Sequence, residues 1–155
     1  MYYLQPLQEV DFAAAADVWE SSVRATHDFL SESDIQRFRA LLPDYFAKAS
    51  LLVGLFSAAG DELMGFAGVN TEAQSLDMLF LRADCLGQGM GEALLRWAVR
   101  YGGARLVDVN EQNPKALRFY QRHGFVIQSR SELDGLGNPF PILHLAYQGD
   151  GWENE

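Results

Sequence analysis

Apolar residues follow two different periods along this chain, and turn-forming residues separate the segments. From Glu9 to Thr26, apolar side chains recur at steps of three and four positions, which predicts an amphipathic helix. The stretches SLLVGLFS and ELMGFAGVN are short and apolar and are separated by AAGD, which predicts two strands joined by a turn. Further strands are expected at 2–7, 76–82, 104–110, 125–133 and 139–147, and further helices at 89–101 and 113–124.

Residues that start and stop helices refine this picture. A second helix is expected to begin at Ser31, and Pro43, which lacks a backbone N–H, is expected to bend or break it. Asn113 caps the last helix, and Pro114 suits its first position. The order of strands and helices predicts one α/β domain of the α+β type with a mixed sheet, spanning residues 1–148, followed by a flexible acidic tail at 149–155.

The composition is that of an ordinary globular protein and excludes several other classes. Of the 155 residues, 48% are hydrophobic and 21% are charged, which is enough to bury a sizeable core. No apolar stretch approaches the ~20 residues of a membrane helix, and the N-terminus lacks a secretory pattern, so a cytoplasmic protein without membrane association is expected. The single cysteine, Cys85, excludes an internal disulfide and is expected to be a small apolar core residue.

The formal net charge of −9 bears on the partners of the protein. It argues against sequence-independent binding to nucleic acid, which requires Lys and Arg side chains to neutralise phosphates. It is compatible with a cationic substrate such as an amine. The His, Asp and Glu residues show no metal-ligand spacing, so no metal is expected. His144 alternates with Leu143 and Leu145 and is expected to face the other side of the sheet.

The segment LGQGMGEALL, residues 86–95, follows an apolar strand, opens a helix and carries glycine at three alternate positions. Unpaired amides in the first turn of a helix attract anions, and glycine lets a phosphate approach them closely. The spacing does not match the G-x-G-x-x-G of dinucleotide-binding folds, because Glu92 or Leu94 occupies the sixth position. It also lacks the Lys of a G-x-x-x-x-G-K-[ST] phosphate loop. Both of these nucleotide-binding motifs are therefore rejected.

GQGMGEALL resembles the acyl-CoA pyrophosphate loop of the GNAT (Gcn5-related N-acetyltransferase) superfamily, whose pattern is Q/R-x-x-G-x-G/A. The pattern runs from Leu86 through Gly89 to Gly91, and the departure at Leu86 implies weaker pyrophosphate contacts or compensation by Gln88 or Arg82. Further along the chain, NPKALRFYQRHGF resembles the superfamily's N-x-x-A-x-x-F-Y-x-x-x-G-F segment. RATHDFLS, VNEQNPKALRFYQRHGF and RSELDGLGNPFPILHLAY also resemble a bacterial subfamily of peptidyl-lysine acetyltransferases.

This resemblance implies the GNAT fold, a mixed, mostly antiparallel central sheet flanked by helices, in which strands 76–82 and 104–110 splay apart to hold acetyl-CoA. Tyr120 is implied to be the general acid that protonates the departing thiolate, which suits a phenol of pKa ~10. Main-chain groups of the first splayed strand are implied to stabilise the oxyanion. The residues implied to bind the cofactor are Leu79, Phe80, Leu81, Leu86, Gly87, Gln88, Gly89, Met90, Gly91, Glu92, Asn113 and Tyr120.

Several residues compete for the role of general base. An ammonium of pKa ~10.4 must lose its proton before it attacks, so a base or a chain of water molecules has to help. The superfamily often uses a carboxylate on the central strand, which favours Asp77 and Glu72, while Glu111, His27 and Asp28 remain alternatives. The residues expected to bind the acceptor substrate are His27, Asp28 and Phe29.

Three functions are compatible with these motifs. The resemblance favours an acetyl-CoA-dependent N-acetyltransferase that acts on a primary amine, with the lysine side chain of a peptide or protein preferred. A small-molecule amine acetyltransferase fits the same sequence. A non-catalytic acyl-CoA-binding sensor is a third alternative, which the departure at Leu86 keeps open. Dimers are common in the superfamily, so the resemblance also allows a homodimer.

Overall fold

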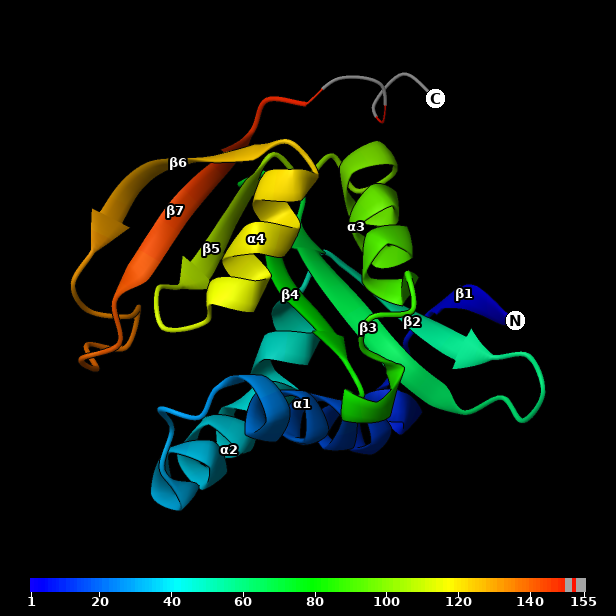
Figure 1. The fold of residues 1–155 in the computed structure, drawn as a ribbon. Helices are drawn as coiled ribbons and strands as arrows, with labels where there is room; N and C mark the ends of the chain where they lie inside the picture. Colours follow the sequence, from blue (N-terminus) through cyan, green and yellow to red (C-terminus); the bar gives the residue numbers. More distant parts are fainter. Residues whose placement is uncertain (150–151, 153–155) are drawn as a thin grey trace.

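Seven strands form one sheet in a computed structural model that describes residues 1–149 and residue 152 (Figure 1). The strands are β1 (Tyr2–Pro6), β2 (Leu51–Ser57), β3 (Leu63–Asn70), β4 (Ser75–Leu81), β5 (Leu106–Asn110), β6 (Phe125–Ser131) and β7 (Ile142–Tyr147). The helices are α1 (Phe12–Thr26), α2 (Glu32–Lys48), α3 (Met90–Arg100) and α4 (Pro114–Arg122), and short 3-10 turns lie at Glu9–Asp11 and Ala83–Cys85.

The sheet is mixed and mostly antiparallel, as the sequence predicted. Its strand order is β1-β2-β3-β4-β5-β7-β6, and only β4 and β5 run parallel to each other. These two strands pair only where Ser75 meets Leu106 and Leu76 meets Val107, and beyond that point they diverge. Asp77 lies at a bulge, because its neighbours pair with consecutive residues of β3, and a bulge bends the strand that carries it. A wedge therefore opens between β4 and β5.

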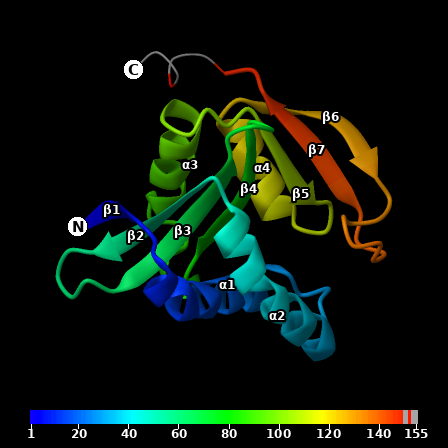
Figure 2. The ribbon, with the colours of Figure 1, turned by 180° about the vertical axis from the view of Figure 1, so that it is seen from behind.

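Helices cover both faces of this sheet. On one face, α3 and α4 pack over the central strands, and Leu94 is fully buried there (Figure 1). On the opposite face, seen from behind in Figure 2, α1 and α2 bury Trp19 and pack around Phe66. Successive side chains of a strand point to opposite faces, so β4 contributes Leu79 to the first core and Phe80 to the second. The wedge thus has a distinct chemical environment at each face.

Of the bend or break expected at Pro43, the break does not occur, because α2 continues through this residue to Lys48. Leu42 and Phe46 are buried in the core beneath the helix, and their packing offsets the hydrogen bond that proline cannot donate. The expected helix start is confirmed. The Ser31 hydroxyl accepts a hydrogen bond from the N–H of Asp34 at 3.0 Å, and the Asp34 carboxylate accepts one from the N–H of Ser31 at 3.0 Å.

The loop between β6 and β7 is longer than the turn expected at 134–138. The two strands end at Ser131 and begin again at Ile142. The Asp134 carboxylate closes the loop by accepting hydrogen bonds from the N–H groups of Leu136 and Asn138, at 2.9 and 2.8 Å. Pro141 has no N–H to donate to a strand ladder, so β7 cannot extend as far toward the loop as the apolar pattern suggested.

The C-terminal residues are only partly described, since 150–151 and 153–155 of the expected flexible tail lie outside the described residues. Trp152, which the sequence placed in that tail, is described and packs against the domain. Its ring stacks on His123 at 5.3 Å, and the guanidinium of Arg96 lies 5.5 Å from its centroid. Separately, none of the helices in the described part of the chain is long and apolar enough to span a membrane.

Candidate active site

The glycine-rich loop after β4 holds glycines in two kinds of backbone conformation. Gly87 and Gly89 have φ angles of 77° and 83°, in the left-handed region that L-residues avoid. Gly91 is a regular residue of α3, and a Cβ there would lie 3.4 Å from the Phe119 ring and 3.5 Å from Leu81. The first two glycines therefore shape the loop, whereas a Cβ at Gly91 would make contacts of ordinary van der Waals length.

This loop leads directly into α3, and among the described residues the first backbone amides of that helix have no hydrogen-bond partner. Gly89 is the N-terminal cap of the helix, and no side chain caps it. The N–H groups of Met90, Gly91 and Glu92 precede the first intrahelical bond, which runs from Ala93 N–H to Gly89 at 3.3 Å. With the positive end of the helix dipole behind them, these amides form a site that favours an anion.

The two residues expected to compensate for Leu86 are both engaged elsewhere. The Arg82 guanidinium pairs with Asp84 at 2.8 Å and with Glu62 at 3.0 Å. The Gln88 side-chain amide donates to the Asp84 carbonyl at 3.0 Å. Leu86 itself is 41% exposed on the loop. Both side chains therefore contact Asp84, and the groups left free at the start of α3 are main-chain amides.

Cys85 lies beside this loop and is buried, as expected for a small core residue. Burial, together with the hydrogen bond that its thiol donates to Asp84, raises the pKa of the thiol above its usual value. A raised pKa keeps the sulfur protonated and disfavours it as a nucleophile.

Tyr120 and Asn113 of the second motif lie on the α4 side of the wedge. Tyr120 is buried against Phe119 and Phe125, with ring centroids 5.1 and 5.7 Å away. Burial raises the pKa of its phenol, so the hydroxyl stays protonated at neutral pH. Within the described part of the chain, that hydroxyl forms no hydrogen bond, so it is available to a ligand. The Asn113 side chain caps α4, accepting a hydrogen bond from the N–H of Ala116 at 3.3 Å.

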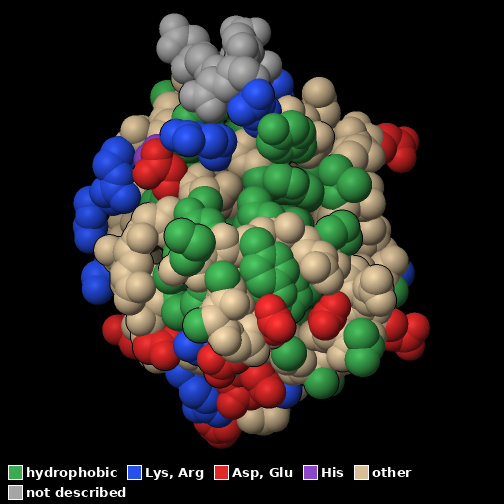
Figure 3. Space-filling view, turned by 90° about the vertical axis from the view of Figure 1, so that its right-hand side faces the viewer, with side chains coloured by type: hydrophobic (Ala, Val, Ile, Leu, Met, Phe, Trp, Pro, Cys, Tyr) green, Lys and Arg blue, Asp and Glu red, His purple; other side chains and the backbone are tan. Residues whose placement is uncertain are grey.

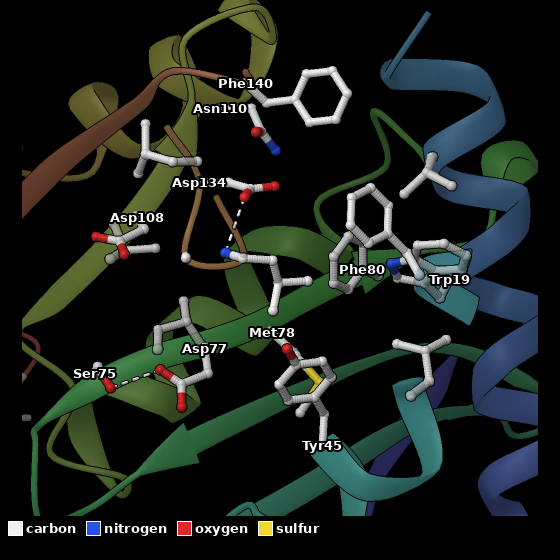
Figure 4. Close-up of a pocket in the computed structure, with 18 of the residues that line it drawn as sticks. Trp19, Tyr45, Ser75, Asp77, Met78, Phe80, Asp108, Asn110, Asp134 and Phe140 are labelled. Atoms are coloured by element: carbon white, nitrogen blue, oxygen red, sulfur yellow. Dashed lines mark hydrogen bonds between the residues drawn. The ribbon is translucent and has the colours of Figure 1, made fainter. Parts of the chain in front are cut away.

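A cavity of about 740 Å³ opens on the other face, between the wedge, the two N-terminal helices and the β6–β7 loop. Aromatic rings form much of its wall (Figure 4). Those from α1, α2 and the segment between them are Trp19, Phe29, Phe38 and Tyr45, and those from the other side are Phe80 and Phe140. Carboxylates of Asp77, Asp108 and Asp134 also line it, and Lys48 is the only Lys or Arg among the described lining residues. The cavity suits a cation on an apolar stem.

The cavity brings together some of the candidates named from the sequence and not others. Asp77, His27 and Phe29 line it. Glu72 is exposed on the turn between β3 and β4, Asp28 points to solvent, and neither is among the lining residues. Glu111 also lies outside it, where Arg130 pairs with the carboxylate at 2.6 Å and lowers its pKa. Asp77, whose carboxylate accepts a hydrogen bond from the Ser75 hydroxyl at 2.6 Å, is the candidate base that reaches the wedge.

Sequence reasoning missed several lining residues. Phe140 was placed in a strand, yet it lies in the β6–β7 loop and meets Phe29 at 5.4 Å and Phe38 at 6.4 Å. Asp108 alternates with buried Val107 and Val109 on β5, and this period of two could have identified it as facing the opposite side. Among the described residues, no group of three His, Cys, Asp or Glu side chains could hold a metal ion.

His27 is neutral in this cavity wall, because burial lowers the pKa of its imidazole to about 4. Between pH 6.5 and 4 the unfolded chain therefore takes up a proton that the folded protein does not, so stability falls as the pH falls. We expect this residue to account for a loss of about 2 to 3 kcal/mol in the free energy of unfolding across that range. Urea unfolding of the wild type and of His27→Gln at several pH values measures this loss. If the free energy of unfolding depended on pH equally in the two proteins, the result would contradict the burial of a neutral His27.

The comparisons with known proteins agree with this geometry. The family model of the acetyltransferase (GNAT) domain matches residues 52–127. A Salmonella typhimurium protein named peptidyl-lysine N-acetyltransferase YjaB is 39% identical over 130 residues, which cover 84% of this chain and 87% of that protein. The solution structure of apo YjaB from Escherichia coli superposes with a TM-score of 0.84 at 33% identity, covering 97% of this chain and 99% of that one.

A more distant neighbour shares the fold. The crystal structure of the PaiA N-acetyltransferase from Thermoplasma acidophilum, in complex with coenzyme A, superposes with a TM-score of 0.73 at 20% identity, covering 95% of this chain and 99% of that one. Fold, glycine loop and wedge together define an acyltransferase of the GNAT type, and the chain belongs to the GNAT acetyltransferase family. Within the family its similarity is to the YjaB proteins, which confirms the subfamily expected from the sequence.

Proposed function

We propose that this protein transfers the acetyl group of acetyl-CoA directly to the side-chain amine of a lysine in a peptide or protein. The observation that carries the proposal is the wedge between β4 and β5. It lies between an anion-binding helix start on one face and a cavity lined by carboxylates and aromatic rings on the other. Such an arrangement suits a donor that carries phosphates on one face and a cationic acceptor on the other. The reactive end of the donor and that of the acceptor then meet in the wedge.

The chain's residues fit acetyl-CoA. Free amides at Met90, Gly91 and Glu92 suit the pyrophosphate. Beyond Leu76, no described strand pairs with the β5-facing edge of β4, so main-chain groups around Leu79–Leu81 can bind pantetheine and stabilise the oxyanion. Although the chain is acidic, α3 and α4 carry five of its twelve Lys and Arg residues, and Figure 3 shows basic side chains gathered along that side. When bound, acetyl-CoA supplies the activated acyl group.

Tyr120 is the proposed acid. As the amine nitrogen bonds to the carbonyl carbon and the carbon–sulfur bond breaks, negative charge develops on sulfur, and the phenol donates a hydrogen bond toward it. Because burial raises the phenol pKa and a thiol has a pKa of about 8.5, complete proton transfer from the phenol is unfavourable even to the fully formed thiolate, so Tyr120 stabilises that thiolate by a hydrogen bond. The proton that the nitrogen loses as the amide forms balances the one that the CoA thiol finally gains. Donation therefore strengthens as the thiolate forms, which stabilises the transition state more than the ground state.

Asp77 is the proposed base. It lies at the bulge where β4 leaves β5, and it lines the acceptor cavity. Its hydrogen bond from Ser75 holds it in place (Figure 4). A carboxylate there accepts the amine proton directly or through one water molecule, so that a neutral amine attacks. Neutral His27 lines the same cavity and can contribute hydrogen bonds without adding a competing positive charge.

The relatives named above act, by their names, on lysine in peptides, which supports that acceptor. One observation favours a small amine instead. Arg37 of α2 donates to the Asn138 side chain at 2.9 Å, and Phe29 meets Phe140, so the β6–β7 loop contacts the N-terminal helical part beside the cavity. Because these contacts narrow the cavity, they limit the size of the acceptor that can enter it.

The proposal is tested by measuring thiol release from acetyl-CoA with a panel of amines: lysine peptides, free peptide N-termini, polyamines and aminoglycosides. We expect turnover with lysine peptides and slower turnover with the others. Preference for a polyamine or an aminoglycoside would establish the small-amine alternative. Tight acetyl-CoA binding with no turnover on any class would favour the non-catalytic sensor.

A further inference from the structure

Asp108 occupies a special place in the wedge that the proposed mechanism does not use. Ser75 with Leu106 and Leu76 with Val107 are the last parallel pairs. The next residue of each strand is a carboxylate, Asp77 on β4 and Asp108 on β5, and both line the acceptor cavity. Figure 4 shows the two residues on the same side of the cavity, across from Trp19 and Phe80.

A chain of side chains across three neighbouring strands holds Asp108. Its Oδ1 lies 2.6 Å from Nδ1 of His144 on β7, and Nε2 of His144 lies 2.7 Å from the Ser131 hydroxyl oxygen on β6. Asp108 and His144 are also direct partners in the β5–β7 ladder. An ionised carboxylate only accepts hydrogen bonds, so Nδ1 of His144 carries the proton in this contact. Nε2 of His144 shares the second hydrogen bond with the Ser131 hydroxyl.

This chain leaves one carboxylate oxygen for a ligand. Within the described part of the molecule, Oδ2 of Asp108 accepts no hydrogen bond, and the side chain is 65% exposed. His144 fixes the rotation of the carboxylate by occupying Oδ1. In contrast, the cavity carboxylate of Asp134 is occupied by hydrogen bonds within its own loop. The carboxylate of Asp108 is therefore both oriented and accessible.

We propose that Asp108 binds the ammonium group of the acceptor as it enters the wedge, and that His144 and Ser131 are positioning residues that orient it. This inference rests on the proposed function. Binding precedes proton removal, so Asp108 contributes to acceptor affinity, whereas Asp77 removes the proton. The aromatic wall packs on the alkyl stem of the acceptor, and the carboxylate selects the charged amine over a neutral group of the same shape.

The test compares two peptides bound to the CoA-saturated protein, measured by calorimetry so that no turnover is needed. One contains lysine, and the other contains its aminooxy analogue, whose terminal –O–NH2 is uncharged at pH 7.5. Asp108→Asn removes a charged hydrogen bond to the ammonium group and should weaken binding of the lysine peptide about fivefold to tenfold. The same substitution should change binding of the uncharged analogue by less than about twofold. His144→Ala should weaken lysine-peptide binding about threefold, and His144→Gln, whose amide can still donate to Asp108, should restore much of it.

Glu132→Gln is the matched control, because Glu132 is an exposed acid next to Ser131 that does not line the cavity. It should leave both affinities unchanged, and all variants should keep the wild-type acetyl-CoA affinity. Unchanged lysine-peptide binding in Asp108→Asn, or an equal loss for both peptides, would overturn the inference. Absence of acetyl transfer by the wild type would contradict the proposed function without bearing on this binding measurement.

Discussion

Tyr120→Phe is expected to lower kcat for acetyl transfer about hundredfold, in line with the loss of one positioned proton donor. The substitution removes only the hydroxyl, which forms no hydrogen bond within the described part of the chain. The ring contacts with Phe119 and Phe125 remain. We therefore expect the free energy of unfolding to change by less than about 1 kcal/mol and the acetyl-CoA affinity by less than about twofold. Stopped-time thiol assays and calorimetry measure these quantities.

Tyr101→Phe is the control for removing a phenol hydroxyl. Tyr101 is exposed at the end of α3, away from the wedge. Removal of its hydroxyl should therefore leave kcat unchanged. A fall of less than about threefold in Tyr120→Phe, with saturating substrates, would show that Tyr120 serves as core packing only. A rise in KM for acetyl-CoA with unchanged kcat would instead assign it to cofactor binding.

Gly89→Ala is expected to weaken acetyl-CoA binding tenfold or more. Gly89 has a φ angle of 83° at the start of α3, and an L-residue there is strained by about 1 to 2 kcal/mol. Relief of this strain rotates the amides that follow it, at the site proposed for the pyrophosphate. A Cβ at Gly89 meets no protein atom within 4 Å, so the effect comes from backbone strain and from the ligand's own space.

Gly103→Ala separates binding from general destabilisation. Gly103 has a φ angle of 70°, and a Cβ there also meets nothing within 4 Å, but it lies after the far end of α3. Both variants should therefore lose similar stability in thermal unfolding, while only Gly89→Ala loses acetyl-CoA affinity. If calorimetry gave the two variants equal affinities for acetyl-CoA, the glycine loop would not be part of the cofactor site.

Local sequence signals predicted much of the fold and the family. Apolar periods located the strands and helices, and the alternate glycines marked the loop that leads into α3. The structure shows positive φ angles at Gly87 and Gly89, whereas Gly91 is a regular residue of α3. Pro43 does not end α2 as a break there would require, because buried Leu42 and Phe46 stabilise the helix around it. Tertiary packing outweighed the local preference there.

The aromatic cavity beside the wedge could not be predicted from local patterns, because its residues come from distant segments. Phe140 and Phe29 meet only when the β6–β7 loop folds toward the segment after α1. Asp108 and His144 become partners only through the register of β5 and β7, which places β7 between β5 and β6. The bulge that carries Asp77 is likewise visible only in the pairing with β3.

The central claim is tested most directly by following both products of one reaction. Wild-type protein, acetyl-CoA and a peptide with a single lysine are incubated, free CoA is quantified, and acetylated peptide is measured and sequenced by mass spectrometry. The account predicts one acetyl-lysine for each CoA released, with both falling together in Tyr120→Phe. CoA release without acetylated lysine, or tight acetyl-CoA binding with neither product, would contradict it.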